Sequence, residues 1–225
     1  YMQRKTGAFE GGFCKNTVYR FLNNTKTNWQ RFTTLLSARI INNFMKPLTS
    51  DNRKDVFIID DSLFDRSRSC KTELLARVFD HCSMKYKRGY RMLTLGWSDG
   101  NSFVPVNHCL LSAAEDKNLL CEASSYDGRS LAGKRRRQSR RKATEVMLEL
   151  IHMAQKSGLS AKYVLFDSWF SSPKAVIALK QEHGLDTIAM VKKSSKIKYG
   201  YQDGRFNIKE IYSKNRKRRG RSKYL

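Results

Sequence analysis

The spacing of apolar residues changes about fifty residues into the chain. Before that point, apolar residues recur with a period near 3.6 over residues 17–22 and 29–44, which predicts two helices. Two asparagines separate these segments, and Pro47 within a polar stretch predicts a break. We therefore expect a helical N-terminal segment over residues 1–50.

Beyond the break, the pattern predicts strands that alternate with helices. Apolar runs predict strands at residues 56–61, 89–97, 102–111, 162–167 and 185–191. Asp99-Gly100 lies between the second and third runs and predicts a hairpin. One apolar face predicts a helix over residues 144–156, and Pro173 begins a second helix that ends near Gly184. This order of elements is typical of a mixed α/β sheet.

The basic residues are concentrated in two stretches. The 225 residues carry 44 Lys and Arg against 20 Asp and Glu, a net charge of +24. Residues 129–142 hold eight basic residues and no acid, and residues 190–225 hold thirteen against two acids. Such local density favours a polyanion, most simply nucleic acid, as the partner. A solvated basic loop or a targeting signal is the alternative.

Other classes of protein fit the composition poorly. No run approaches the roughly 20 apolar residues that a membrane helix needs, so we expect no membrane partner. The five cysteines form no C-x-x-C pair and are odd in number, which disfavours a disulfide framework. The adjacent donors His81-Cys82 and His108-Cys109 raise the question of zinc. Neighbours on a strand point to opposite faces, so neither pair could chelate from one side.

Carboxylates stand at the ends of two predicted strands. Asp60 and Asp61 follow the first apolar run, and Asp167 follows a later one. Ligands of an open sheet gather beyond the carboxyl ends of its strands, so these acids could converge on a divalent cation. Mg²⁺ prefers oxygen ligands and keeps several waters, so two or three carboxylates suffice. Each Asp could instead begin a loop or cap a helix.

Three segments resemble bacterial insertion-sequence transposases: FIIDDS at 57–62, DHCSMKYKRGYR at 80–91 and YVLFDSWF at 163–170. These are DDE enzymes with an RNase-H-like core and a β-rich insertion before the last acid. The resemblance covers most of the chain from about Val56 onward. It implies an α/β, RNase-H-like mixed sheet with flanking helices over residues 51–192, followed at 193–225 by the basic start of a β-rich insertion.

The resemblance also implies site residues. The family's first acid lies on the first core strand, here Asp60 or Asp61. We favour Asp60, because the first acid is commonly followed one residue later by Ser or Thr, here Ser62. The second acid maps onto Asp167. The third, a Glu on a helix beyond the insertion, has no counterpart, and the setting of Glu210 does not match it. We therefore expect a chain truncated before the third acid, with weak metal binding and poor catalysis.

For an intact enzyme, the resemblance implies that Asp60 and Asp167 hold Mg²⁺ or Mn²⁺. Hydrolysis at a transposon end leaves a 3′-hydroxyl, which then attacks a target phosphodiester without a covalent protein intermediate. The implied partner is double-stranded DNA, and the implied setting is a homodimer in the bacterial cytoplasm, associated with the nucleoid. We expect Trp169 and Phe170 to pack in the core, with an approach to a DNA base as the alternative. The basic residues expected to position the duplex are Arg135, Arg136, Arg137, Arg140, Arg141 and Lys142, with Lys192 and Lys193 as weaker candidates.

Two other functions fit the same residues. Another RNase-H-like nuclease or a resolvase would need the same acids, and only its substrate would distinguish it. A noncatalytic basic DNA-binding protein would need none of the acids. Its affinity for DNA would then be indifferent to magnesium and to replacement of the three Asp residues by Asn.

Overall fold

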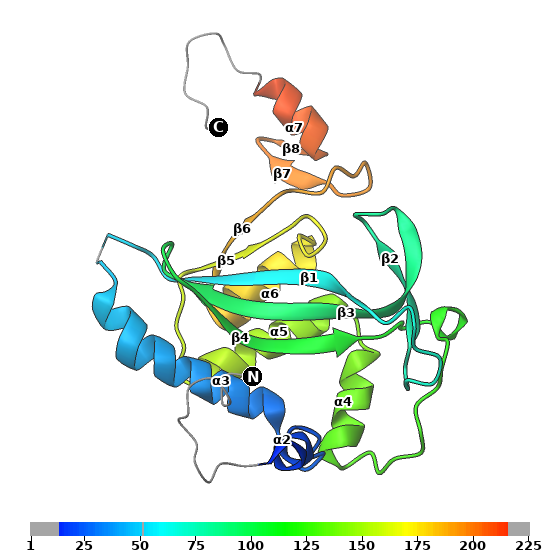
Figure 1. Ribbon diagram of the computed structural model, residues 1–225. Helices are drawn as coiled ribbons and strands as arrows, with labels where there is room; N and C mark the ends of the chain where they lie inside the picture. Colours follow the sequence, from blue (N-terminus) through cyan, green and yellow to red (C-terminus); the bar gives the residue numbers. More distant parts are fainter. Residues whose placement is uncertain (1–13, 51, 216–225) are drawn as a thin grey trace.

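A six-stranded mixed sheet forms the centre of the protein (Figure 1). The computed structural model describes residues 14–50 and 52–215. Five strands lie in the order β2-β3-β1-β5-β6, and β4 pairs with β3 on the same side as β2. The strands are β1 (Val56–Asp65), β2 (Ala76–Asp80), β3 (Lys85–Ser98), β4 (Phe103–Leu111), β5 (Tyr163–Phe166) and β6 (Asp186–Ala189).

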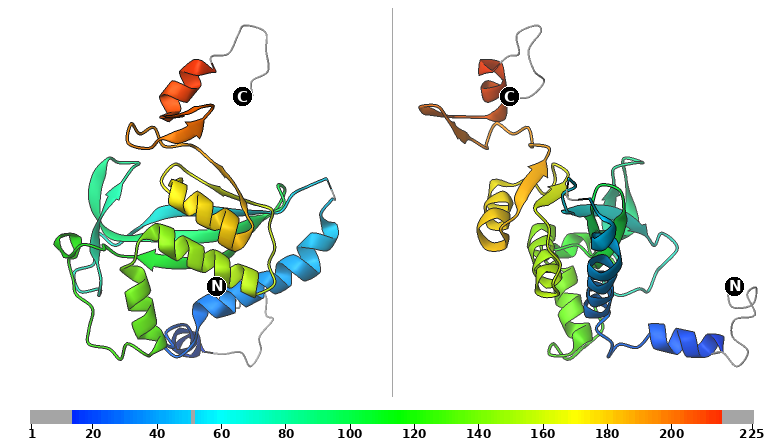
Figure 2. Two further views of the ribbon diagram at one scale, coloured as in Figure 1. Left: turned by 180° about the vertical axis from the view of Figure 1, so that it is seen from behind. Right: turned by 90° about the vertical axis from the view of Figure 1, so that its left-hand side faces the viewer.

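Helices lie along the sheet and a small hairpin extends away from it (Figure 1, Figure 2). The α-helices are α2 (Lys15–Leu22), α3 (Trp29–Ile40), α4 (Leu131–Ser139), α5 (Ala143–Lys156), α6 (Pro173–His183) and α7 (Ile208–Lys214). A π-helical turn (Ile41–Met45) and two 3₁₀ turns (Lys46–Leu48, Asp116–Asn118) complete the helical structure that the model describes. The hairpin joins β7 (Tyr199–Tyr201) to β8 (Gly204–Phe206).

The long strand β3 organises the sheet. It runs antiparallel to all ten residues of β1, while its opposite edge pairs first with β2 and then with β4. The change of partner occurs at Gly89, where a Cβ atom would lie 2.3 Å from the carbonyl oxygen of Phe64. Glycine is therefore required where the two backbones approach. On the other side of β1, β5 and β6 run parallel to it.

The main core lies between one face of the sheet and the helices α3, α5 and α6 (Figure 2). The strands contribute the fully buried side chains Phe57, Leu93, Leu95 and Trp97. From α5, the residues at helical spacing face this layer, and they are Val146, Met147, Leu150, Ile151 and Ala154. The predicted mixed α/β sheet with flanking helices is confirmed.

Local sequence patterns predicted the positions of several elements correctly. The predicted helix over 144–156 is α5, and Pro173 begins α6, which ends at Gly184 with a φ of +68°. The β3–β4 hairpin turns at Asp99, whose carboxylate accepts hydrogen bonds from the backbone N–H groups of Asn101 and Ser102. These turns and caps follow directly from their residues.

The sequence pattern predicted some elements incompletely or not at all. The strand predicted to end at its two acids continues to Asp65, because β3 pairs with β1 along its whole length. The basic stretch before α5 folds into the helix α4, and the strand β2 was not predicted. The C-terminal basic stretch contains β7, β8 and α7, while its residues 216–225 lie outside the described part. Within the described ranges, no helix is long and apolar enough to cross a membrane.

Candidate active site

A cleft of about 1290 Å³ lies where β1 continues past the end of β5, and all three predicted acids line it. Asp60 and Asp61 come from β1, and Asp167 follows β5 directly, as predicted. The walls come from four other places in the chain. These are β2 with the turn that follows it, the end of β4 with the loop that follows it, the start of α5 and the loop after β5.

The two acids of β1 point to opposite faces of the strand, because they are neighbours in it. Asp61 shares the face of the buried residues Phe57 and Ile59. Its carboxylate accepts hydrogen bonds from Nε and Nη2 of Arg91, and its side chain is only 14% exposed. Asp60 is exposed and, within the described residues, forms neither a salt bridge nor a side-chain hydrogen bond. An ion on one face of β1 would therefore meet only one of them.

Asp167 is held in a turn at the mouth of the cleft. One carboxylate oxygen, Oδ1, accepts a hydrogen bond from the backbone N–H of Trp169 at 2.8 Å. The side chain is exposed, and its second oxygen accepts no hydrogen bond from any described residue. The parallel register places Ile58 opposite Leu165 as the last pair of the two strands, so Asp60 and Asp167 each follow this pair by two residues. Both residues are exposed and line the same cleft.

The donors in the cleft fit a hard cation with few protein ligands. Exposed carboxylates without a counter-charge suit Mg²⁺ or Mn²⁺, which keep part of their water shell. No group of three or more His, Cys, Asp or Glu side chains that could hold a metal occurs in the described ranges. Glu210, the acid left unassigned, caps α7: its carboxylate accepts from the backbone N–H of Asn207 at 2.8 Å.

The loop after β5 presents an aromatic ring to the cleft. Phe170 is 1% exposed and packs in the core as expected, but Trp169 is 52% exposed, so the core role predicted for it is wrong. The Trp169 ring centre lies 5.7 Å from that of His81. Arg91 and Lys192 lie over the ring at 5.8 and 5.2 Å, within the range of cation–π attraction. The predicted DNA-binding residue Lys192 thus lies beside the cleft.

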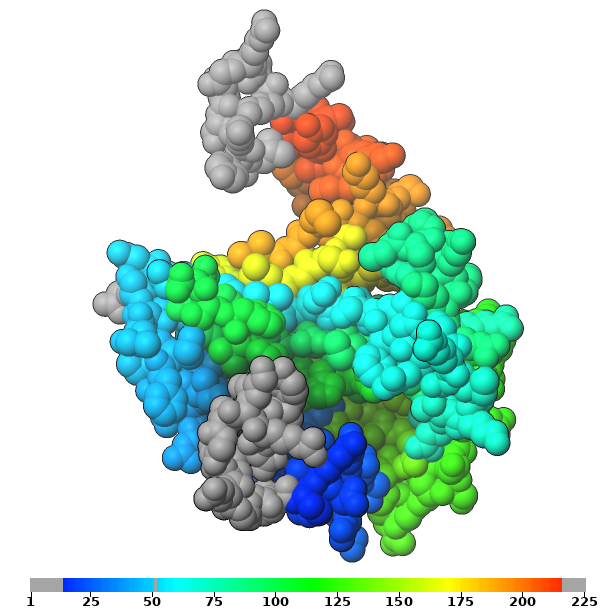
Figure 3. All heavy atoms as spheres, in the orientation of Figure 1, coloured from blue at the N-terminus to red at the C-terminus, as the bar shows by residue number. Residues whose placement is uncertain are grey.

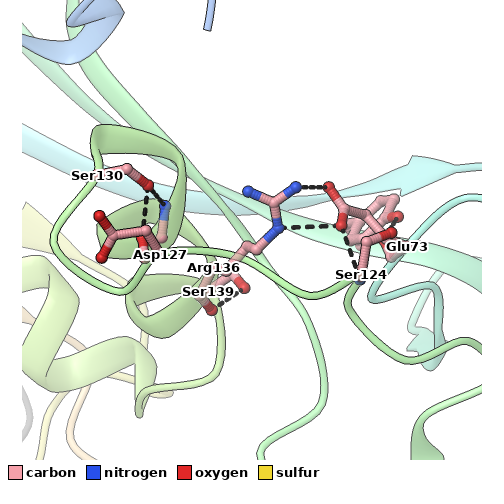
Figure 4. Close-up of polar contacts among 8 residues, drawn as sticks. Glu73, Ser124, Asp127, Ser130, Arg136 and Ser139 are labelled. Carbon is pink, nitrogen blue, oxygen red and sulfur yellow. Dashed lines mark hydrogen bonds and ion pairs between the residues drawn. The ribbon is translucent and has the colours of Figure 1, made fainter. Parts of the chain in front are cut away.

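Three of the six basic residues proposed around α4 bind other parts of the protein. Arg136 forms a two-pronged ion pair with Glu73, with N–O distances of 3.0 and 2.6 Å (Figure 4). Arg135 donates to the side chain that caps α3, and its burial lowers the pKa of its guanidinium. Arg140 donates to Asp116 at 2.6 Å. These contacts hold α4 against the rest of the fold.

The other three basic residues are exposed. Arg137 and Lys142 have no side-chain salt bridge within the described ranges, whereas Arg141 contacts two glutamates of α5. Arg141 and Lys142 also line the cleft, at the start of α5. Lys193 is exposed next to Lys192.

Sequence reasoning missed Arg91 as a site residue. Its signal was its position: Arg91 has the same strand parity as Leu93 and Leu95, which are fully buried. A charged residue on the apolar face of a strand needs a partner, since an unpaired charge is costly to bury. Here the partner is Asp61.

Comparison with known protein families supports an enzymatic function for the chain. The family described as DDE superfamily endonuclease matches residues 4–224, nearly the whole chain. No match to the chain was found among curated proteins. The matched region includes the cleft, its acids and both basic stretches.

Proposed function

We propose that this chain, which belongs to the DDE superfamily endonucleases, is a transposase of the insertion-sequence type. The mixed sheet with its flanking helices is the RNase-H-like fold of that superfamily. The observation that supports the proposal is that Asp60 and Asp167 line one cleft together with the basic residues Arg141 and Lys142. The proposed reaction is cleavage of DNA at the ends of a mobile element, followed by transfer of the cut strand to a target.

Asp60 and Asp167 are the residues proposed to hold the cation, Mg²⁺ or Mn²⁺. Bound there, the cation would offset the negative charge that develops on the phosphate during transfer. Asp60 is preferred to Asp61 because Arg91 already compensates the charge of Asp61. Asp61 and Arg91 then act as a structural pair that connects β1 to β3.

The exposed basic residues are proposed to position the duplex by its phosphates. Arg141 and Lys142 flank the cleft on one side and Lys192 lies beside Trp169. Arg137 and Lys193 extend this surface. Arg135, Arg136 and Arg140 support it indirectly through their contacts within the protein. The net charge of +24 favours long-range attraction of DNA.

The biological setting belongs to the same proposal. We infer that the partners are double-stranded DNA at the element ends and at the target. The proposed active form is a homodimer on paired ends, in the bacterial cytoplasm at the nucleoid. The family match and the charge support the DNA partner; the dimer and the location follow from the transposase assignment.

A strand-cleavage assay on an element-end duplex with Mn²⁺ tests the proposal. We expect Asp60→Asn and Asp167→Asn to remove cleavage and Mn²⁺ binding by calorimetry, while Asp61→Asn retains both in its folded fraction. Asp65→Asn is the matched control, because Asp65 is an exposed acid on β1 that does not line the cleft. Cleavage that survives in both Asp60→Asn and Asp167→Asn would exclude this site.

The products separate the alternative functions. Cleavage without transfer to a target would favour another RNase-H-like nuclease. DNA binding that is indifferent to Mn²⁺ and to all three Asn substitutions, with no cleavage by the wild type, would leave a noncatalytic DNA-binding protein.

A further inference from the structure

The hairpin made of β2 and the first residues of β3 (residues 76–89) carries positive charge without partners. It contains four Lys or Arg and one acid, Asp80, whose carboxylate binds Lys87 at 2.7 Å. The side chains of Arg77, Lys85 and Arg88 are exposed and make no salt bridge or hydrogen bond with any described residue. Three cations on the hairpin therefore remain available to an external anion.

Two of these cations face each other across the hairpin. Arg77 and Arg88 are direct partners in the antiparallel register, so their side chains leave the same face at the same level. Like charges directly opposite destabilise a strand pair, whereas opposite charges stabilise it. The arrangement is unfavourable for the isolated protein and becomes favourable when anionic groups bind the two guanidinium groups.

The next pair on the same face is aromatic. Phe79 lies opposite Tyr86, with ring centres 5.2 Å apart, and Tyr86 is 69% exposed. His81 packs edge-on against Phe79 at 5.0 Å. A tyrosine hydroxyl is one of the groups that donate to phosphate oxygens in protein–DNA contacts. The face thus presents guanidinium groups and a phenol in a row.

The turn of the hairpin is held in one conformation. The Asp80 carboxylate accepts from the backbone N–H of Cys82 at 3.0 Å and from the hydroxyl of Ser83 at 2.7 Å. Its hydrogen bond with Lys87 lowers the pKa of Asp80 and raises the pKa of Lys87, so both stay charged around neutral pH. A fixed turn reduces the ordering cost of binding.

The hairpin also borders the candidate active site. Arg77, Phe79 and His81 line the cleft that contains Asp60 and Asp167. Figure 3 shows the hairpin, in blue-green, beside the yellow loop that follows β5. The contact between the rings of His81 and Trp169 joins the two. A polyanion bound to the hairpin would therefore continue into the cleft.

We propose that this hairpin binds the sugar–phosphate backbone of double-stranded DNA, with Arg77 and Arg88 each contacting a phosphate. The inference rests on the proposed function, since it assigns a contact surface for the same substrate. A two-stranded ribbon fits the major groove of B-form DNA, which is about 12 Å wide. The major groove of A-form RNA is too narrow and deep for side chains to read, so duplex DNA is the better occupant.

The test compares two variants that lose the same charge. Arg77→Gln/Arg88→Gln removes the facing pair, and Arg31→Gln/Arg39→Gln removes two exposed arginines of α3 outside the cleft. Binding of a fluorescent DNA duplex is measured by anisotropy without divalent metal, between about 50 and 200 mM salt. Thermal unfolding of each variant is measured in parallel.

The expected result is a change in salt dependence. Each lost phosphate contact lowers the slope of log affinity against log salt by about 0.9, so the hairpin variant should lose about 2. Over a fourfold rise in salt, the wild type then loses about tenfold more affinity than the hairpin variant. The α3 variant should keep the wild-type slope. The unfolding temperature of the hairpin variant should equal or exceed that of the wild type, because a repulsive pair is removed.

Other outcomes overturn the inference in distinguishable ways. An unchanged slope with a lower unfolding temperature would give the two arginines a purely structural role. Equal binding of duplex RNA would overturn the choice of DNA. If the wild type itself ignores duplex DNA, the proposed function fails together with the hairpin. If the wild type binds and cleaves DNA and the hairpin variant binds it equally well, only the hairpin assignment fails.

Discussion

Replacing Asp61 with Asn tests the ion pair that connects β1 and β3 at the wall of the cleft. The Asp61 side chain is 14% exposed and that of Arg91 is 35% exposed, so water already compensates part of the arginine charge. A hydrogen bond to a charged group contributes about 1.5–3 kcal/mol, and this partial exposure reduces the expected loss to about 1–2 kcal/mol. For a chain of this size, each kcal/mol lowers the unfolding temperature by about 2–4 °C, which gives a decrease of about 2–8 °C.

Asp60→Asn is the matched control for this measurement, because it makes the same chemical change on the neighbouring residue. Asp60 is exposed and has no side-chain partner within the described ranges, so its replacement should change stability by less than about 0.5 kcal/mol. Thermal unfolding followed by circular dichroism, in the presence of a chelator, compares the two. Arg91→Gln and the double variant with Asp61→Asn complete a double-mutant cycle, whose coupling energy isolates the pair.

Addition of Mn²⁺ should remove most of the difference in stability between the two variants. At a Mn²⁺ concentration ten times the dissociation constant, a site present only in the folded state adds about 1.4 kcal/mol of stability. We expect this gain in the wild type and in Asp61→Asn, and its loss in Asp60→Asn. If Asp61→Asn loses the gain and Asp60→Asn keeps it, Asp61 is the metal ligand. If the chelated Asp61→Asn protein unfolds at the wild-type temperature, the structural role given to the pair is wrong.

Two further predictions concern the fold. Hydrogen bonds from the backbone N–H groups of Ser102 and Asn101 and from the Thr49 hydroxyl lower the pKa of the buried Asp99 to about 2. Since this pKa is below the unfolded value of about 3.9, the carboxylate should stabilise the fold by about 2 kcal/mol above pH 4. Urea unfolding should show this difference in the free energy of unfolding between wild type and Asp99→Asn at pH 7. The difference should disappear as the pH falls from about 4 to 2. A difference that does not change with pH would contradict the reasoning. Burial raises the pKa of the Cys109 thiol to about 11, so iodoacetamide should label Cys109 far more slowly than the exposed Cys82 in the native protein and equally fast in urea. Mass spectrometry of the labelled peptides checks this, and equal native rates would contradict the packing of β4.

Long-range pairing explains why the first strand was predicted too short. The apolar run of β1 ends at Ile59, so the sequence alone places the acids at a strand end. Backbone pairing with β3 carries the strand on to Asp65 through partners about thirty residues away. An uninterrupted apolar run also hides which residues share a face. Only the burial of Phe57 and Ile59 assigns Asp61 to the covered face and Asp60 to the other.

The helix α4 was hidden for a different reason. Arginine and lysine are good helix formers, but this segment has no apolar stripe to signal a buried face. Its contacts with the fold are polar instead. Arg136 meets Glu73 at a distance of 63 residues in sequence, and Arg140 meets Asp116 at 24. The local sequence pattern cannot distinguish a helix that is held by such polar contacts from a solvated basic loop.

Sequence motifs predict part of the candidate site, and the rest depends on how the strands and loops fold. The acids and the basic stretches suggest the proposed chemistry, because hard oxygen donors and dense positive charge have few other joint uses. Trp169 and Phe170 show what the motif leaves open: adjacent in sequence, one faces the cleft and the other the core. The turn closed by the Asp167 carboxylate on the Trp169 N–H sets their directions. In the proposed site Asp167 would have two roles, one for each oxygen: Oδ1 closes the turn on the Trp169 N–H, and the other oxygen would bind the cation. Asp167→Asn would keep the turn through its amide oxygen while removing the charge, so this substitution separates metal binding from the placement of the loop.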